Sequence, residues 1–435
     1  MAVTGRLVAL LVVGIVPVIL FAAVPGGPAL ALLGWLVLCA LLFVIDLLAA
    51  ASPRQLGVER VLPDRVRLDE DVEQTILVTN LGRRPLQGVF RDPWVPSVRR
   101  SSALLRAAVP AGERRALRSV LRAGRRGDQH SPGIAVRSLG PLGLAARQAM
   151  LDVPGRIRVL PPFRSRRHLP SRLLRLRELD GATSILTRGQ GTEFDSLREY
   201  VRGDDVRSID WRATARGREV VVRTWRPERD RRIVILADTA RTQATRVGDE
   251  TRLDTAFEAA LLLSALADRA GDRVDFVALD RRVRARVHGR TGPALIPELV
   301  DAMSTIEPEL IEMDWSLVPG VVRRSTTQRS LVVLLTALDS RGQASPLLAA
   351  LPEITQRHLV LVAAVEEPEL QRLSTERGDR AEVYRAAAAE RALAERGRLI
   401  EAVRRQGGDV VVAPPGTLPT ALVDRYLHYK AAGRL

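Results

Sequence analysis

Residues Ile233–Asp238 read IVILAD, a short β-branched run that ends at an acidic residue. Further apolar runs of strand length follow at Val274–Leu279, Leu331–Leu335 (LVVLL), Leu359–Val365 (LVLVAAV) and Val410–Val412. Between these runs the sequence predicts helices over Leu253–Ala270 and approximately over 293–305, 345–356, 379–406 and 417–432. Apolar strands that alternate with helices are typical of a parallel sheet covered on both faces. We therefore expect residues 232–435 to form a doubly wound α/β domain.

Oxygen-bearing side chains follow these strands, at the edge where such sheets gather their functional groups. The candidate ligands come from three loops and are Asp238, Thr242, Thr251, Asp254, Thr336 and Asp339. Carboxylates and hydroxyls together suit a hard cation such as Mg²⁺ or Mn²⁺. The alternative is that Asp238 and Asp339 only cap the helices that follow them. Ala240 and Ala337 lack a ligand atom where the pattern needs one, which favours the capping interpretation.

Two apolar runs open the chain. Leu7–Val24 carries no charge, Ala29–Ala51 carries only Asp46, and Pro25–Pro28 (PGGP) joins them as a turn. About 20 apolar residues cross a bilayer as a helix, so residues 1–52 are predicted to form a transmembrane hairpin. A cleaved signal peptide is the alternative for the first run, but the second run would still anchor the protein.

Basic residues near the two runs predict the orientation of the hairpin. They are Arg6 before the first run and Arg54, Arg60, Arg65 and Arg67 after the second. Because positive charge is retained in the cytoplasm, we expect a multi-pass protein of the cytoplasmic membrane with both termini and its soluble domains in the cytoplasm. Asp46 lies near the cytoplasmic end. It is interpreted as a snorkelling carboxylate, with a functional intramembrane acid as the alternative.

The formal net charge of +16 is not spread evenly along the chain. Residues 1–155 carry +8, residues 156–232 carry +9, and residues 233–435 carry −1. All basic residues except Lys430 are arginine, which indicates a codon bias, and an aromatic content of 4% offers no platform for stacking bases. We therefore expect no nucleic-acid partner. The single Cys39 lies in an apolar run, which excludes a disulfide framework and a thiolate metal site.

Residues 56–160 are predicted to form a small all-β, sandwich-like domain. Val72–Thr79 has strand composition, and Asn80–Pro85 supplies a turn. Residues 161–231 form a separate region that begins with a strongly basic stretch. Its arginines are Arg164, Arg166, Arg167, Arg172, Arg175 and Arg177. This stretch is interpreted as a solvated helix face or as a surface for anionic lipid.

Carboxylates and arginines alternate around Asp204, Asp205 and Asp210. They are typical of an ion-pair network that holds one segment against another, and they could instead build an acidic active site. The five histidines are scattered without the spacing of metal ligands. The sequence contains no phosphate-binding loop and no nucleophile elbow.

The stretch from Gly191 to Arg232 resembles the signature of the DUF58 family. The matching residues are Phe194, Leu197, Arg198, Tyr200, Gly203, Asp204, Asp205, Arg207, Ile209, Asp210, Trp211, Ala215 and Arg216. This resemblance implies a bacterial protein with an N-terminal helix pair, a β-rich region, the signature and a von Willebrand A-like domain over 232–435. It also implies that the Asp238 loop corresponds to a metal-ion-dependent adhesion motif, from which this sequence departs at Ala240 and Ala337.

The resemblance further implies a link to MoxR-type AAA+ ATPases, which are often encoded beside members of this family. We therefore expect a membrane-anchored, non-enzymatic scaffold or adaptor whose A-like domain binds a protein partner. That partner would be an AAA+ ATPase acting in complex or envelope assembly. The alternative is a metal-dependent hydrolase that uses Asp204, Asp205 and Asp210 as ligands or bases.

Overall fold

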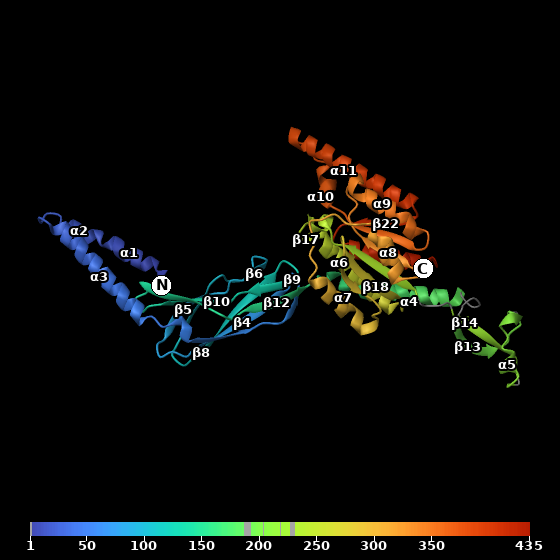
Figure 1. Ribbon diagram of the computed structural model, residues 1–435, viewed down its shortest axis with the longest axis horizontal. Helices are drawn as coiled ribbons and strands as arrows, with labels where there is room; N and C mark the ends of the chain where they lie inside the picture. The colour runs from blue at the N-terminus through green and yellow to red at the C-terminus, as the bar shows by residue number, and fades with distance from the viewer. Residues whose placement is uncertain (1, 187–192, 203, 218, 227–230) are drawn as a thin grey trace. The chain divides into compact units, whose positions relative to one another are not determined.

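The computed structural model describes residues 2–186, 193–202, 204–217, 219–226 and 231–435 (Figure 1). The chain divides into two compact units, Met1–Leu160 and Pro161–Leu435. The division falls at the Pro161-Pro162 pair, directly after the last strand of the first unit. Each unit has its own hydrophobic core.

The apolar N-terminal sequence forms helices α1 (Gly5–Val13), α2 (Ile15–Leu20) and α3 (Gly27–Ala49). Gly14 separates α1 from α2, and a Cβ atom at Gly14 would lie 2.2 Å from the Trp35 ring. The Trp35 indole donates to the Leu10 carbonyl (3.1 Å), which ties α3 to α1.

Only part of this sequence has the length of a membrane span. Among the described residues, one helical stretch, Gly27–Gln55, is long and apolar enough to cross a membrane. The first apolar stretch, Gly5–Leu20, is shorter. Helical geometry gives its 16 residues a length of about 24 Å, against a hydrocarbon core of about 30 Å. The helix expected over Leu7–Val24 therefore ends earlier than the sequence predicted.

Residues 56–160 form β-strands joined by short turns. The strands of the first unit are β1 (Ala2–Val3), β2 (Leu56–Val61), β3 (Arg65–Arg67), β4 (Asp71–Asn80), β5 (Leu86–Arg91), β6 (Val98–Arg100), β7 (Leu105–Val109), β8 (Arg114–Ala123), β9 (Gly127–Ser131), β10 (Ile134–Leu139), β11 (Ala145–Leu151) and β12 (Gly155–Leu160). They form sheets with the orders β1-β11-β10-β5-β7, β2-β4-β8-β6 and β3-β12-β9. Alternate residues of β4 are buried, and Ile76, Val78 and Phe90 lie in the shared core.

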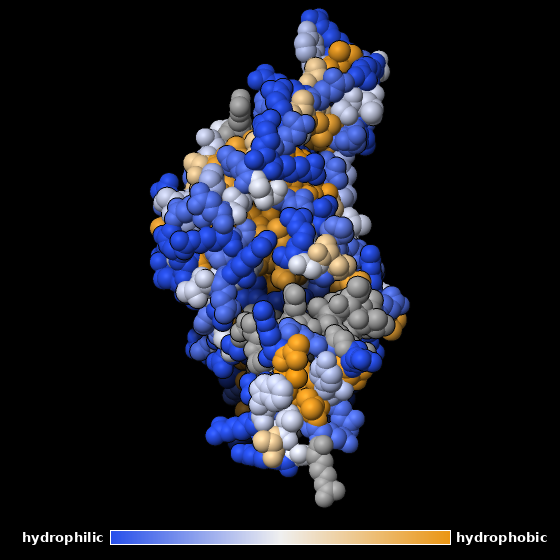
Figure 2. Space-filling model, turned by 90° about the vertical axis from the view of Figure 1, so that its right-hand side faces the viewer, coloured by the Kyte–Doolittle hydropathy of each residue, from blue (hydrophilic) through white to orange (hydrophobic). Residues whose placement is uncertain are grey.

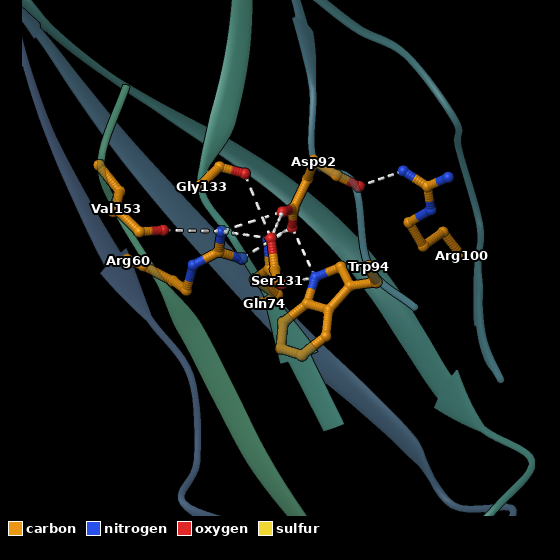
Figure 3. Close-up of polar contacts among 8 residues, drawn as sticks. All are labelled: Arg60, Gln74, Asp92, Trp94, Arg100, Ser131, Gly133 and Val153. Carbon is orange, nitrogen blue, oxygen red and sulfur yellow. Dashed lines mark hydrogen bonds and ion pairs between the residues drawn. The ribbon is translucent and has the colours of Figure 1, made fainter. Parts of the chain in front are cut away.

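A buried polar network lies inside this β module (Figure 3). The Asp92 carboxylate accepts two hydrogen bonds from the Arg60 guanidinium (2.7 and 2.9 Å). It also accepts from Gln74 Nε2 (2.7 Å), Trp94 Nε1 (2.6 Å) and Ser131 Oγ (2.8 Å). The side chains of Arg60 and Asp92 are only 5% and 6% exposed. The network therefore joins β2, β4 and β9 to the segment that follows β5.

The second unit is built on a six-stranded sheet with the order β19-β18-β15-β20-β21-β22. Its strands are β15 (Arg232–Asp238), β18 (Arg273–Leu279), β19 (Val283–Val287), β20 (Leu331–Leu335), β21 (Leu359–Val365) and β22 (Gly408–Ala413). Neighbouring strands are parallel except for the edge strand β19, which is antiparallel to β18. The carboxyl ends of the parallel strands therefore share one edge.

Helices cover both faces of this sheet. They are α6 (Arg252–Arg269), α7 (Leu295–Ser304), α8 (Leu317–Ser325), α9 (Arg341–Thr355), α10 (Pro368–Leu373), α11 (Arg380–Arg405) and α12 (Leu418–Ala431). Val234, Val332 and Val360 lie in one core cluster with residues of α8 and α9. Helix α6 contacts β15 and β18 and is buried from Arg252 to Ala267, as expected of a helix enclosed by protein.

Residues 164–226 precede the sheet. A 3₁₀ turn (Arg164–His168) leads into α4 (Leu169–Leu186), which packs on α6 and α12. Strands β13 (Glu193–Glu199) and β14 (Val221–Arg226) then form an antiparallel hairpin that encloses the short helix α5 (Trp211–Thr214). We refer to residues 193–226 as the signature hairpin. Two short strands, β16 (Arg246–Val247) and β17 (Glu250–Thr251), pair just before α6.

Candidate site at the carboxyl edge of the sheet

Asp238 ends β15 at the carboxyl edge of the sheet and is 3% exposed. Its carboxylate accepts from the Thr336 hydroxyl (2.7 Å), the Thr242 hydroxyl (3.4 Å) and the Ala240 amide (2.8 Å). Thr336 directly follows β20, the strand beside β15. Two neighbouring strands therefore bring together a carboxylate and two hydroxyls, which are three of the six candidate ligands named from the sequence.

No cationic side chain bonds to Asp238 among the described residues, so its negative charge lacks a direct counterion. Burial raises the pKa of Asp238 to about 6, although the hydrogen bonds from Thr336, Ala240 and Thr242 oppose that rise. The nearby Asp280 raises the pKa further. The ionised form of Asp238 is thus costly in the folded protein and would be favoured by an added positive charge.

Asp280, which the sequence analysis did not single out, lies close to this site. It follows β18 and accepts from the Thr239 hydroxyl (2.9 Å) and from Arg284 (2.8 Å). Burial would raise the pKa of Asp280, but hydrogen bonds from Arg284, Thr239 and two backbone amides hold it below its usual range. The rule that identified Asp238, an acid directly after a buried strand, also applies to Asp280 and could have found it.

The side chain of Asp238 lines a pocket of about 510 Å³. Polar residues of the pocket wall include Thr242, Thr336, Ser340 and Glu312. Apolar residues of the wall include Met313, Trp315, Pro346 and Leu347. Arg241 also lines the pocket and pairs with Glu312. Among the described residues no cation bonds to Asp238, so the pocket is suited to bind a ligand that carries positive charge beside apolar groups.

The donor atoms around Asp238 fit a cation that keeps most of its waters. Two hydroxyls lie within hydrogen-bonding reach of one carboxylate, and Mg²⁺ is commonly held by one or two carboxylates together with several waters. A site made mainly of carboxylates is not present in the described part of the chain. No group of three or more His, Cys, Asp or Glu residues is arranged there to hold a metal.

The other three predicted ligands lie in contacts of their own. Thr251 and Asp254 form the capping box of α6, in which the Thr251 hydroxyl and the Asp254 carboxylate lie 2.6 Å apart. Asp339 accepts from Arg252, which is only 2% exposed and also donates to Glu367. None of the three lines the pocket beside Asp238. The predicted set of six therefore divides into Asp238, Thr242 and Thr336 on one side and three structural residues on the other.

The signature carboxylates hold the signature hairpin together. Asp204 accepts from Arg198 (2.8 and 2.6 Å) and from the Val201 amide, and these bonds lower its pKa. Asp210 caps α5 through the Arg212 and Ala213 amides.

Two further contacts complete this pattern. Asp210 also pairs with Arg223 (2.8 Å), and its pKa is lowered first by the Ala213 amide and then by Arg223. Asp205 accepts from the Arg207 amide (3.0 Å). These contacts favour the ion-pair interpretation for Asp204 and Asp210 and a capping role for Asp205 over an acid–base role.

Several apolar members of the signature hairpin face solvent. The exposed fractions are 44% for Leu197, 37% for Tyr200, 62% for Val201, 63% for Val206, 67% for Trp211 and 39% for Val220. Figure 2 shows apolar side chains gathered on this hairpin in the lower part of the view. Arg207 and Arg216 are also exposed. Gly203 lies outside the described residues, and the side chain of Phe194 is likewise not described.

Together the fold and the site define a protein with an apolar N-terminal helix, a β module, a hairpin rich in ion pairs and an α/β domain with a pocket at its sheet edge. The family model described as "Protein of unknown function DUF58" matches residues 196–396. This match confirms the resemblance seen in the sequence over those residues.

Relatives of this chain include uncharacterized proteins of Mycobacterium bovis and Mycobacterium tuberculosis. Each is 26% identical over 185 residues, which cover 42% of this chain and 57% of the relative. The chain thus spans little more than half of their length.

Similar solved structures include proximal thread matrix protein 1 from the mussel byssus, with a TM-score of 0.26, 14% identity and 46% of each chain covered. A Salmonella alpha-2-macroglobulin mutant gives a TM-score of 0.20 and 20% identity, over 24% of this chain and 7% of that chain.

Proposed function

We propose that this chain is a membrane-anchored, non-enzymatic scaffold whose α/β domain binds a protein partner at the pocket beside Asp238. The observation that carries the proposal is a buried carboxylate that no cation of the described residues bonds and that opens into a partly apolar pocket. Such a carboxylate gains most from a ligand that supplies positive charge. A parallel sheet with helices on both faces supports assignment of this domain to the von Willebrand A-like class.

A divalent cation is the simplest source of that positive charge. Asp238, Thr242 and Thr336 would hold Mg²⁺ or Mn²⁺, and the ion would offer an open coordination position to an oxygen of the partner. The residues of this chain orient the site: Thr336 and Thr242 fix the carboxylate, and Met313 and Trp315 supply apolar contact area. The departures at Ala240 and Ala337 leave fewer protein ligands than the motif normally provides.

The membrane part of the proposal rests on the N-terminal helices. Helix α3 is the candidate span, and α1 with α2 would complete a two-pass hairpin because Trp35 ties them to α3. The positions of Arg6 and Arg54 beside the apolar runs support a cytoplasmic location for both termini and for the two soluble parts. The resemblance to DUF58 proteins makes a MoxR-type AAA+ ATPase the first partner to test.

The experiment measures binding of the full-length protein, reconstituted in lipid nanodiscs, to a purified MoxR-type ATPase from the same organism. We expect binding that requires Mg²⁺ or Mn²⁺ and falls at least tenfold in the Asp238→Asn variant. Glu401→Ala, which removes an exposed carboxylate from α11, is the matched control and should bind like the wild type. Equal binding by Asp238→Asn and wild type would refute the proposed role of the pocket.

A further inference from the structure

The last turn of α3 is hydrogen-bonded to the β module through a buried carboxylate. Asp46 is 1% exposed and accepts three backbone hydrogen bonds, from the amides of Leu142 (2.7 Å), Leu144 (2.7 Å) and Ala145 (2.8 Å). These amides belong to the turn between β10 and β11 and to Ala145, the first residue of β11. A Cβ atom at Gly140 would lie 2.3 Å from the Asp46 carboxylate, so the turn approaches the helix too closely for a side chain there. Asp46 is therefore an anchor for the β module and does not snorkel to water.

Further contacts fix the same junction. Arg147 Nε donates to the Leu47 carbonyl (3.1 Å), and Arg84 donates to the Leu48 carbonyl. Both carbonyls lie at the C-terminal end of α3, where the helix leaves such groups without intrahelical donors. Strand β1 pairs with β11 just before α1 begins. The start of α1 and the end of α3 are thus both attached to the same edge of the β module.

This attachment determines how far the module stands from the bilayer. The 23 residues of α3 give it a length of about 34 Å, slightly more than the roughly 30 Å of the hydrocarbon core. If α3 spans the membrane, as the proposed function states, the turn around Asp46 lies at the level of the lipid headgroups. The loops that contact this turn, residues 81–84 and 140–144, must then lie at the same level.

The side chains of these loops have the chemistry of a membrane-contacting surface. We define the basal surface as Arg6, Arg83, Arg84 and Leu142, all of which are exposed. Leu142 is 48% exposed, and the Arg6 guanidinium donates to its carbonyl (3.5 Å). Two nearby acids already have partners. The Asp46 carboxylate accepts from backbone amides, and Glu113, whose carbonyl accepts from the Asn80 amide, is paired with Arg115 (2.7 Å). The basal surface therefore carries positive charge around an apolar tip.

We propose that the basal surface binds the headgroups of anionic phospholipids, with Leu142 inserted at the membrane interface. The proposal rests on α3 being a membrane span, and its partner is the bilayer itself. Each arginine near an anionic surface adds to the electrostatic attraction, and the Asp46 anchor lowers the entropic cost of bringing the surface to the membrane.

The basic stretch at 164–177 is a weaker candidate for the same role. Arg172 and Arg175 both pair with Asp424, at 3.2 and 3.9 Å, and Arg164 pairs with Glu250 (3.4 Å). These arginines stabilise the packing of α4 and the preceding turn within the second unit. Half of the predicted lipid-binding stretch therefore serves contacts inside the protein, whereas the basal surface lies directly beside the candidate span.

The test places an environment-sensitive fluorophore at Leu142→Cys in full-length protein carrying Cys39→Ser, which removes the only native thiol. The protein is reconstituted in nanodiscs of phosphatidylcholine, with or without one third phosphatidylglycerol. Leu104→Cys is the matched control, because Leu104 is 51% exposed on the same β module. It directly precedes β7 and so lies at the opposite end of that strand from Val109, which pairs with Leu86. Quenching by lipids that carry a nitroxide in the headgroup region is then measured.

We expect quenching of the Leu142 label to exceed that of the Leu104 label several-fold, to increase with phosphatidylglycerol, and to lose that increase in the Arg83→Glu variant. Equal quenching of the two labels would overturn insertion of the loop. Strong quenching that does not depend on phosphatidylglycerol or on Arg83 would overturn recognition of anionic headgroups. Extraction from native membranes by alkaline carbonate distinguishes failure of the anchor, because a protein released by carbonate has no span.

Discussion

Two buried carboxylates, one in each unit, differ in what surrounds them. Asp92 in the β module is 6% exposed and is paired with the Arg60 guanidinium. Asp238 at the edge of the α/β sheet is 3% exposed, and the described part of the chain bonds it through two hydroxyls and an amide. Burial would raise the pKa of Asp92, but Arg60, Gln74 and Ser131 hold it below its usual range, whereas burial raises the pKa of Asp238 to about 6.

The comparison indicates which of the two sites is complete. At Asp92 a cation and three neutral donors fill the acceptor positions of the carboxylate, so nothing further needs to bind. At Asp238 two hydroxyls and an amide hold the carboxylate, no cation among the described residues bonds to it, and a pocket of about 510 Å³ opens beside it. A buried carboxylate without its cation is a typical feature of a ligand site, whereas a fully paired one is typical of a structural network.

The largest expected effect is the loss of stability when the Asp92 network is disrupted. Arg60→Ala removes the counterion of Asp92 and leaves a buried negative charge, which typically costs about 3–5 kcal/mol. It also removes the guanidinium that lies over the Trp94 ring (5.4 Å). Hydrogen exchange of β4 and β9 peptides in the full-length protein should show the corresponding loss of protection.

Arg114→Ala is the control for this substitution. Arg114 pairs with Glu59 (2.5 Å) in the same module, but both side chains are more than half exposed, so the loss should be below about 1 kcal/mol. A loss of similar size in the two variants would mean that the Arg60–Asp92 pair does not stabilise the β module in the way its burial suggests.

The second prediction concerns the incomplete site, where a substitution is expected to stabilise the protein instead of destabilising it. The folded-state pKa of Asp238 is raised, so the stability that this group contributes is fully present below its unfolded pKa of about 4 and is lost as pH rises through about 6. In EDTA at pH 8, Asp238→Asn should therefore stabilise the α/β unit by up to about 3 kcal/mol. Hydrogen exchange of β15 at pH 8 and pH 5 measures the difference. A variant that is less stable than the wild type at pH 8 would contradict the prediction.

A smaller effect is expected when the incomplete site is filled. Addition of Mg²⁺ at ten to one hundred times its dissociation constant should stabilise the wild type by about 1.4–2.7 kcal/mol. The gain should be absent in Asp238→Asn and reduced in Thr336→Val, which keeps the shape of the side chain but lacks the hydroxyl. Thermal unfolding with and without Mg²⁺ provides the measurement. An equal gain in Asp238→Asn would place the cation elsewhere on the protein.

The sequence predicted the two sites unequally well, for physical reasons. The five parallel strands and Asp238 were predictable because apolar runs and the residues that follow them are local features. Strand β19 (VRARV) and helix α8, with Pro319 and Gly320, lack such a pattern and were missed. The Asp92 network could not be predicted, because its members come from strands far apart in the sequence and the sequence does not reveal how those strands pair. Asp46 was noticed, but its partners lie about 100 residues later.

The smallest expected effect separates the scaffold from the hydrolase alternative. In calorimetric titrations with Mg²⁺ and Mn²⁺, Asp204→Ala should bind the ions like the wild type, because Asp204 already accepts from Arg198 and the Val201 amide. Asp238→Asn should lose the binding. If Asp204→Ala abolished metal binding while Asp238→Asn retained it, the signature carboxylates would become the metal site, and the contrast between the two buried carboxylates would no longer identify where this protein binds its ligand.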